Sequence, residues 1–349
     1  MKRRDLFAAA TLPFAAPAWA QTTQDHSASK TPGEIGLTGP LHTITLITPD
    51  LPGTAKMYRD ALGMDLNGPI TMPPVTQQTL ARAWGIPADL KWSLYVFRRP
   101  TVPLAAQIRV VVTETPTPGI RKSWNRQEAG PYGMGFPNAD VMAWDKHIAS
   151  LGFKRATPEI ERFPLKRPDG TPYDVLEATF DGPDFLRSIA ISRRDGMSQV
   201  GDVDPQTGRG GPAYATQVVA DMDAMVRFLT TVLDYEVRTD RMWKAYEVPF
   251  RFITAYAKGV KNGHIALAAY DAKDIVPGTN VPPAPPNRGM AMWSLQVQSL
   301  SEMQKRIAAA GLMPTGRYTK IDAADLGPRS AVMVRAPNGF VFELFEKEA

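Results

Sequence analysis

Histidine and carboxylate side chains are the candidates for catalysis or metal binding in this sequence, because it contains no cysteine. A disulfide framework, a thiolate metal site, an iron–sulfur cluster and a cysteine nucleophile are therefore excluded. Any metal would need histidine and carboxylate ligands, and the chain has 4 histidines. The sequence contains no Walker loop and no G-x-G-x-x-G, G-x-S-x-G or H-E-x-x-H motif. Asp202-Val203-Asp204 begins like a calcium-binding loop, but the glycine and glutamate of such a loop do not follow at the required spacing.

Four copies of one small unit have to position these side chains. In each copy, a strand-like run is followed by a residue that can cap a helix and then by apolar residues at helical spacing. The four capping residues are Asp50, Asp140, Asp221 and Ser299. The dipeptides Asp181-Gly182, Asn262-Gly263 and Asn338-Gly339 are typical of tight turns with positive φ, and we expect them between the last two strands of three units. The sequence therefore predicts an α+β fold built from four βαβββ units.

The order of the units along the chain predicts two domains. The chain has 349 residues, 44% of them hydrophobic, which suits about two packed cores. Residues 195–212 are rich in Gly and Asp and predict a linker between a first domain at 39–194 and a second at 213–349. Two insertions, Pro69–Ala88 and the proline-rich Val276–Pro286, interrupt the units and could fold over an opening.

The first twenty residues predict export. Residues 1–20 have a charged start, an apolar run from Leu6 to Ala16, and small residues before Gln21, which are the three regions of a signal peptide. The apolar run is too short for a permanent transmembrane helix, and no other apolar stretch is long enough, so we expect no permanent membrane span. Residues 21–38 are predicted to be a flexible lead-in.

Two export routes fit this start. Arg3-Arg4 followed by Asp5-Leu6-Phe7 resembles a twin-arginine signal in which the usual Phe-Leu order is reversed, and the general secretory route stays open. Either route predicts a periplasmic or secreted protein. The net charge of 40 − 35 = +5 is small, and no long Lys/Arg run is interleaved with aromatic residues, so nucleic acid is not an expected partner.

The four units resemble the vicinal oxygen chelate superfamily, which includes glyoxalase I, the extradiol dioxygenases, and the fosfomycin and bleomycin resistance proteins. The resemblance rests on the opening Leu41-His42-Thr43, on Ala61-Leu62-Gly63-Met64, and on the closing hairpin from Ala336 to Glu346. It implies four βαβββ units paired into two vicinal-oxygen-chelate-like domains, each a half-open cup around one site. In metal-using members, His, Gln or Glu on the first and last strands of the units hold one divalent ion.

In the first domain, the resemblance gives one metal-ligand candidate. His42 falls at the first-strand histidine, whereas the other three places hold Val111, Met134 and either Arg187 or Ser188. One imidazole does not hold a metal at useful affinity. His42 is therefore a metal ligand of an incomplete set, a general base, or a histidine that lines a polar pocket.

In the second domain, Glu343 falls at the last-strand carboxylate. Its companions are Tyr214, Met292 and Leu267, and methionine is a poor ligand for a hard divalent ion. Glu343 is therefore a weak metal-ligand candidate, a general base, or a buried structural carboxylate paired with an arginine. Tyr214 could stabilise a developing oxyanion. His264 is expected at the rim of the cup.

A small, flat ligand suits the remaining side chains. We expect Met134 and Tyr132 in the first domain, and Met292 and Trp293 in the second, to line the substrate pocket. An apolar, aromatic-lined pocket with few polar groups suits a small oxygenated, even aromatic, compound.

The sequence supports two functions. The first is an exported glyoxalase-like enzyme that acts on a small oxygenated compound as a lyase, an isomerase or a dioxygenase, with a divalent metal as one option and an incomplete ligand set for it. The alternative is a non-catalytic small-molecule binding protein of the bleomycin-resistance type. Nothing in the sequence indicates the large exposed apolar face of a protein-interaction module, and a homodimer is compatible with either function.

Overall fold

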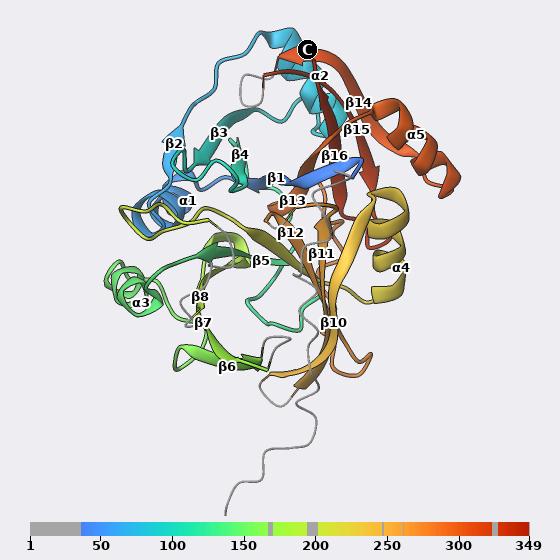
Figure 1. The fold of residues 1–349 in the computed structure, drawn as a ribbon. Helices are drawn as coiled ribbons and strands as arrows, with labels where there is room; N and C mark the ends of the chain where they lie inside the picture. The colour runs from blue at the N-terminus through green and yellow to red at the C-terminus, as the bar shows by residue number, and fades with distance from the viewer. Residues whose placement is uncertain are drawn as a thin grey trace, which may run out of the picture.

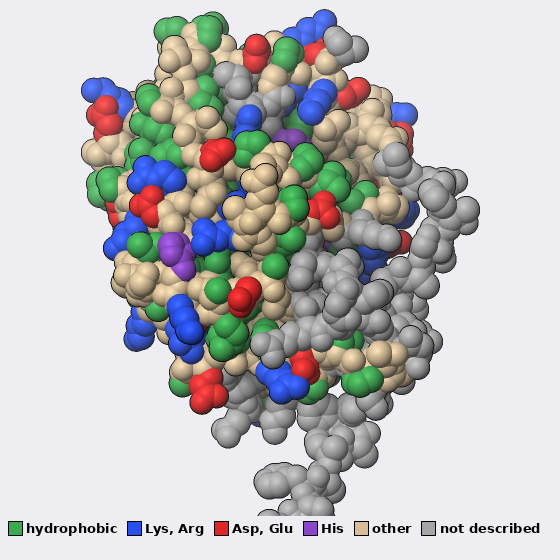
Figure 2. Space-filling view, turned by 60° about the vertical axis from the view of Figure 1, so that its left-hand side comes forward, with side chains coloured by type: hydrophobic (Ala, Val, Ile, Leu, Met, Phe, Trp, Pro, Cys, Tyr) green, Lys and Arg blue, Asp and Glu red, His purple; other side chains and the backbone are tan. Residues whose placement is uncertain are grey.

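The computed structural model describes residues 36–166, 170–193, 202–245, 248–260, 262–322 and 327–348. The expected export signal and most of the lead-in lie outside these residues. No helix in the described part is long and apolar enough to cross a membrane. On the face seen in Figure 2, the coloured Lys and Arg side chains are interspersed with Asp and Glu, so that face carries both signs of charge.

Two eight-stranded mixed sheets form the framework, one in the upper and one in the lower half of Figure 1. Across the first sheet the strands are ordered β14 (Pro314–Asp322), β15 (Pro328–Arg335), β16 (Val341–Lys347), β13 (Gly289–Val297), β1 (Thr38–Thr48), β4 (Gln107–Thr113), β3 (Trp92–Arg98) and β2 (Asp65–Asn67). Across the second sheet they are ordered β10 (Tyr235–Ala245), β11 (Val248–Ala257), β12 (His264–Tyr270), β9 (Tyr214–Val218), β5 (Gly130–Pro137), β8 (Arg187–Arg193), β7 (Pro172–Asp181) and β6 (Glu161–Lys166).

One helix follows the first strand of each unit, as the sequence predicts. These helices are α1 (Leu51–Ala55) with the π-helical η1 (Lys56–Ala61), α3 (Val141–Ser150), α4 (Met222–Arg227) with the π-helical η3 (Phe228–Val232), and α5 (Leu300–Ala309). The predicted caps are confirmed, because the side chains of Asp50, Asp140, Asp221 and Ser299 each accept a hydrogen bond from the backbone three residues on. Two further helical segments are α2 (Pro74–Trp84) and the short η2 (Pro183–Phe185).

The turns predicted from the dipeptides are partly confirmed. Gly263 and Gly339 have positive φ, at 70° and 84°. Gly182 differs: its φ is −107°, and the positive φ angles are those of Asp184 and Phe185. Five residues lie between β7 and β8, so the chain turns back two residues after the glycine.

The sheets pair the units differently from the order along the chain. Chain order predicts that the first unit joins the second and the third joins the fourth. Instead, β1 pairs with β13, which joins the first unit to the fourth, and β5 pairs with β9, which joins the second to the third. Residues 195–212 thus connect two units of one sheet. Because the four units have similar patterns, the sequence does not reveal which strand edges meet.

The two sheets share one hydrophobic core. The ring of Tyr58, on η1 of the first unit, lies 6.3 Å from Phe136 of β5, and that of Phe228, on η3 of the third unit, lies 5.3 Å from Phe342 of β16. Each contact joins a helix of one sheet's units to a strand of the other sheet. The opposite face of each sheet is left to form a cup.

Candidate functional site

The first cup is the face of the first sheet that carries Ile47, Val111 and Glu343, and helix α2 fills it. Leu80 and Trp84 of this helix pack in one buried cluster with Ile47 and Val111. At the far edge of the sheet, a Cβ on Gly316 would lie 2.0 Å from the carbonyl oxygen of Ala83. The insertion Pro69–Ala88 therefore folds over the opening and closes it.

Glu343 lies fully buried in the first cup, and each of its two carboxylate oxygens accepts two hydrogen bonds. The Nη1 of Arg109 and the Oγ of Ser294 donate to Oε2 at 2.9 and 2.5 Å. The Nε1 of Trp84 and the hydroxyl of Tyr318 donate to Oε1 at 3.0 and 2.9 Å. Arg109 is also fully buried, so the carboxylate and the guanidinium form an ion pair away from water.

The charge state of Glu343 follows from these neighbours. Burial by itself would raise its pKa, but the charges of Arg109 and Arg329, with the hydrogen bonds from Ser294 and Trp84, lower the pKa to about 2. An ionised carboxylate that is saturated with donors is a poor general base at neutral pH. The geometry therefore favours the buried structural carboxylate among the three roles considered for Glu343.

The first cup does not fit a divalent metal ion. Within the described ranges, no three His, Asp or Glu side chains come together as a metal site. The guanidinium of Arg109 lies beside Glu343, where it supplies the positive charge. The half-buried His42 contributes no second ligand: its Nδ1 lies 2.9 Å from the hydroxyl of Thr43 and its ring packs edge-on against Phe345.

Three expected pocket residues lie in buried packing. Met292 belongs to the cluster that α2 closes, whereas Met134 and Trp293 point to the shared core and are 0% exposed. The indole Nε1 of Trp293 contacts the sulfur of Met290 at 3.1 Å. Strand parity explains why Met134 and Trp293 lie outside the cups, because a one-residue change in register moves a side chain to the other face of the sheet.

The second cup is the face of the second sheet that carries Tyr132, Glu177, Tyr214 and Arg241, and its edges meet. Strands β6 and β10 are the two ends of the sheet, yet the rings of Phe163 on β6 and Trp243 on β10 lie 5.1 Å apart. The sheet therefore curls almost into a barrel. Both rings are only partly buried, so this contact lies at the surface.

Two carboxylates face each other inside this cup. Glu161 of β6 lies opposite Glu177 of β7 in the antiparallel register. Glu161 is paired with Arg126, whose Nη2 lies 3.3 Å from its Oε2. Glu177 forms no hydrogen bond or ion pair with any residue in the described part of the chain. Burial raises the pKa of Glu177 to about 7, and the charge of Glu161 adds to the rise, while Arg126 and Arg241 oppose it.

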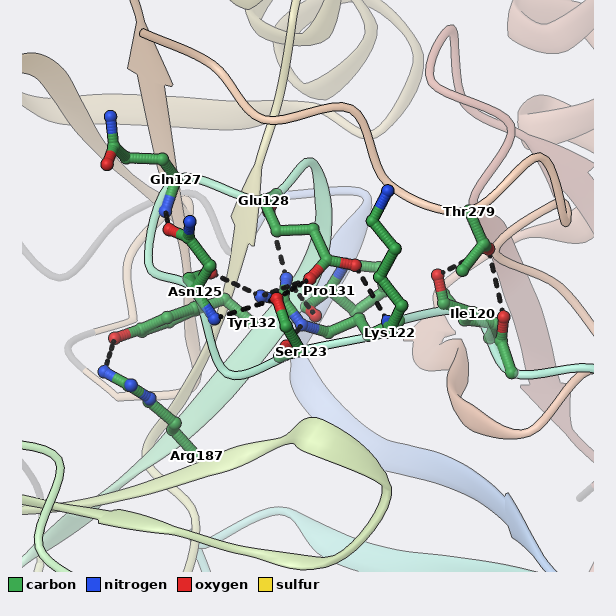
Figure 3. Close-up of polar contacts among 12 residues, drawn as sticks. Ile120, Lys122, Ser123, Asn125, Gln127, Glu128, Pro131, Tyr132, Arg187 and Thr279 are labelled. Atoms are coloured by element: carbon green, nitrogen blue, oxygen red, sulfur yellow. Dashed lines mark hydrogen bonds and ion pairs between the residues drawn. The ribbon is translucent and has the colours of Figure 1, made fainter.

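Tyr132 and Tyr214 both lie in the second cup, although they were assigned to different domains. The hydroxyl of Tyr132 accepts a hydrogen bond from Nη1 of Arg187 at 3.0 Å, as Figure 3 shows. The ring of Tyr214 lies over Gly135, where a Cβ would be 1.9 Å from its Cε1. Burial and the neighbouring Glu177 raise the pKa of Tyr214 well above its usual value.

His264 is not at a rim. It is 4% exposed, and its ring is stacked between those of Tyr214 and Tyr256, with centroids 4.8 and 4.5 Å away. The register places it directly beside Tyr214 on the neighbouring parallel strand. The stack fixes the position of the Tyr214 ring.

A pocket of about 290 Å³ opens at the mouth of the second cup. Arg187 and Tyr270 line it from strands β8 and β12, and Trp124, Arg126 and Gln127 line it from the loop before β5. The pocket thus combines two cations, two aromatic rings and amide side chains, which suits a small polar molecule with a flat apolar part.

A buried ion pair holds the loop that lines this pocket, and Figure 3 shows Asn125, Gln127 and Glu128 of this loop. Arg121 lies 3.8 Å from the carboxylate of Glu128 and donates to the backbone carbonyls of Asn125 and Glu128 at 2.7 and 3.0 Å. The hydroxyl of Thr279, in the proline-rich linker, donates to the carbonyl of Ile120 at 2.9 Å. The linker therefore packs against this loop and fixes it at the mouth.

Sequence reasoning missed the polar groups of the second cup. Glu177 stands between Val175 and Thr179 at the spacing of one strand face, and a carboxylate between two buried residues of one strand face was the available signal. Nothing local pairs it with Glu161 or Arg241, because those strands come together only in the folded sheet. Arg109 was missed for the same reason.

No protein-family model matches the chain, and no curated protein matches its sequence. Solved structures do resemble it. Glyoxalase I from Zea mays has a TM-score of 0.55 at 14% identity, over 88% of this chain and 92% of that chain. A protein from Bacillus subtilis described as a candidate dioxygenase has a TM-score of 0.55 at 15% identity, over 89% and 86%. The chain therefore has a two-domain α+β fold of the vicinal oxygen chelate type, as predicted.

Proposed function

We propose that this protein is an isomerase or lyase that acts on a small oxygenated compound in the second cup, with Glu177 as the proton-transferring group. One contrast carries the proposal. Glu343 in the first cup is saturated with donors and ionised, whereas Glu177 is only partly buried and has no hydrogen bond or ion pair in the described part of the chain. A carboxylate with a pKa of about 7 can both take and return a proton at neutral pH.

The charges around Glu177 suit proton removal next to a carbonyl group. The proton passes from carbon to the Glu177 carboxylate, and the electron pair of the C–H bond moves toward the carbonyl oxygen. Arg126 and Arg241, both close enough to influence the pKa of Glu177, stabilise the negative charge that develops there. Return of the proton to a different carbon completes an isomerisation, and loss of a leaving group completes an elimination.

Solvent exchange tests this function without a known substrate. Purified protein is incubated in D₂O with a panel of 2-oxo and 2-hydroxy acids, and deuterium at the carbon next to the carbonyl is followed by NMR. We expect exchange with at least one panel member, and its loss in Glu177→Gln. Asp174→Asn is the matched control, because Asp174 lies on the same strand but pairs with Arg162 at 2.5 Å on the surface. Exchange that survives in Glu177→Gln would contradict the proposal.

A binding protein without turnover is the second candidate. The filled first cup favours it, because one of the two sites of the fold is closed by α2 and holds an ion pair in place of ligands. Such a protein would bind its ligand equally well in wild type and in Glu177→Gln, and would exchange no proton. The same experiment, with binding measured beside exchange, separates the two functions.

We also propose that residues 1–20 direct export to the periplasm or beyond. The support is the sequence alone, since this segment lies outside the described residues. Amino-terminal sequencing of the exported protein should give Gln21 as the first residue. An Arg3→Lys/Arg4→Lys variant should be retained in the cytoplasm if the twin-arginine route is used, and should be exported normally if the general route is used.

A further inference from the structure

The pocket at the mouth of the second cup has a positively charged lining. Among the described residues that line it, Arg126 and Arg187 are charged and none is acidic. Their acidic partners, Glu161 and Asp181, lie outside the lining, each 3.3 Å from its arginine. The wall of the pocket therefore presents cations, while the compensating carboxylates lie behind them. Such a lining favours an anion over a neutral or cationic ligand.

Arg187 keeps a hydrogen-bond donor that no described residue accepts. Its side chain is 10% exposed, its Nε lies beside Asp181, and its Nη1 donates to the hydroxyl of Tyr132 at 3.0 Å (Figure 3). Within the described ranges, no hydrogen bond uses its Nη2. A guanidinium N–H group that is nearly buried needs an acceptor, and a ligand carboxylate is a strong one.

Tyr270 supplies a second donor to the same space. Burial raises the pKa of Tyr270, so its hydroxyl keeps its proton at neutral pH and can donate a hydrogen bond. The hydroxyl forms no hydrogen bond with a residue in the described part of the chain. Arg126 and Arg187 both lie close enough to influence this pKa. The three polar side chains therefore converge on one place in the pocket.

An aromatic ring is exposed at this pocket. Trp124 is 37% exposed and lines it from the loop before β5. The indole Nε1 donates to the carbonyl of Gly182 at 3.1 Å, and the ring packs edge-on against Phe185 with centroids 4.8 Å apart. These contacts fix the indole and leave part of it open. Val248 and Pro158 extend the apolar lining, so a flat apolar group has a surface to pack on.

We propose that this pocket binds a small carboxylic acid with a flat apolar group. Arg187 and Tyr270 donate hydrogen bonds to its carboxylate, and the apolar group packs on Trp124. The volume of about 290 Å³ is near the lower end for ligand pockets and suits a small acid. Arg126 lines the pocket and also acts on the charge of Glu177, so the acid binds beside that carboxyl group. This inference deepens the proposed function by naming the ligand class, and it rests on the second cup being the working site.

The test compares one acid with its neutral amide. Binding of 4-fluorophenylacetate and of 4-fluorophenylacetamide to the purified full-length protein is measured by fluorine NMR at pH 6, where Glu177 is mostly protonated. The two probes share the ring and differ in the charged group. We expect 4-fluorophenylacetate to bind, and the amide to bind at least about tenfold more weakly, because it lacks a charge-assisted hydrogen bond. Equal affinities, or no binding of 4-fluorophenylacetate, would overturn the inference.

Two substitutions locate the anion. Tyr270→Phe removes only a hydroxyl, so the melting temperature should hold while 4-fluorophenylacetate binds up to about tenfold more weakly. Arg187→Gln combined with Asp181→Asn removes a cation and its partner together, so no carboxylate is left unpaired. This double variant should weaken 4-fluorophenylacetate by about tenfold or more and change the amide little. Wild-type affinity for 4-fluorophenylacetate in both variants would overturn the assignment.

Controls separate the charge from general damage to the pocket. Asp181→Asn alone leaves Arg187 in place and should bind 4-fluorophenylacetate as well as wild type or better; a clear loss would contradict the role of Arg187. Arg162→Gln with Asp174→Asn removes an exposed pair of the same sheet and should leave both affinities unchanged. Trp124→Ala should weaken both probes alike, because they share the ring, and an effect on neither would contradict the placement of the ring.

The outcome separates this inference from the proposed function. Binding that depends on Arg187, without deuterium exchange on any member of the panel, would support the carboxylate pocket and contradict the enzyme. Exchange that depends on Glu177, in a protein that binds the two probes equally, would support the enzyme and contradict the carboxylate pocket.

Discussion

Replacement of Arg109 by methionine tests whether the first cup is a structural site. The change leaves Glu343 buried without its nearest cation, which lies 2.9 Å away in the wild type. The pKa of Glu343 falls from 4.5 to about 2 in the fold. One pKa unit corresponds to about 1.4 kcal/mol, so the surroundings favour the ionised form by about 3 kcal/mol. Because Arg329 remains nearby, we expect Arg109→Met to lower the free energy of unfolding by about 3 kcal/mol, at the low end for a broken buried pair.

The pH dependence gives a second signature of the same pair. The folded pKa of Glu343 is lower than the unfolded one, so its stabilisation is fully present above about pH 4.5 and is lost as the pH falls through about 2. The difference between wild type and Glu343→Gln should therefore shrink over that range. Urea unfolding at several pH values, followed by tryptophan fluorescence, measures both effects.

A double variant and a surface pair complete the experiment. Arg109→Met with Glu343→Leu should recover part of the loss, because the carboxylate that loses its nearest cation is removed as well. Arg162→Met breaks the exposed pair with Asp174 and should cost no more than about 1 kcal/mol. If the losses of Arg109→Met and Glu343→Leu were both below about 1 kcal/mol and simply added in the double variant, the account of the first cup would be wrong.

Four further predictions concern the cups. The rate of deuterium exchange should rise with pH to a plateau, with its half-maximum near pH 7, where Glu177 loses its proton. Glu177→Gln should remove this pH dependence; an unchanged pH–rate profile in the variant would point to another base. Gly135→Ala should lower stability by about 1 to 3 kcal/mol, because its Cβ would meet the Tyr214 ring, and Tyr214→Ala should restore part of it in unfolding experiments. Trp84→Ala should lower the free energy of unfolding by about 3 to 5 kcal/mol, since it leaves a cavity in the first cup and removes a hydrogen-bond donor to Glu343. A loss of less than about 1 kcal/mol would mean that α2 is not part of the core. Dialysis against a chelator should leave the melting temperature unchanged, whereas a clear fall would reveal a metal that the described residues do not indicate.

The candidate site shows how far single residues could be predicted. Tyr132 and Tyr214 were selected for separate domains, yet both lie in the second cup, because β5 and β9 are neighbours there. Glu343 was correctly placed on the last strand, but its partner Arg109 is 234 residues away in the sequence. Glu177 carries the proposed chemistry and had only the weak signal of a carboxylate between buried residues of one strand face.

The sequence by itself determined the local elements and their repetition. Capping side chains such as Asp140, and glycines such as Gly263, act on backbone within a few residues, so their effect can be predicted without the rest of the chain. The tertiary structure alone decided which units share a sheet, which cup α2 fills, and which carboxylate forms no hydrogen bond or ion pair among the described residues. Those outcomes depend on strand edges and side chains that are far apart in the sequence, and on the exclusion of water between them. Glu343 and Glu177 have the same side chain, and their surroundings set their pKa values at about 2 and about 7.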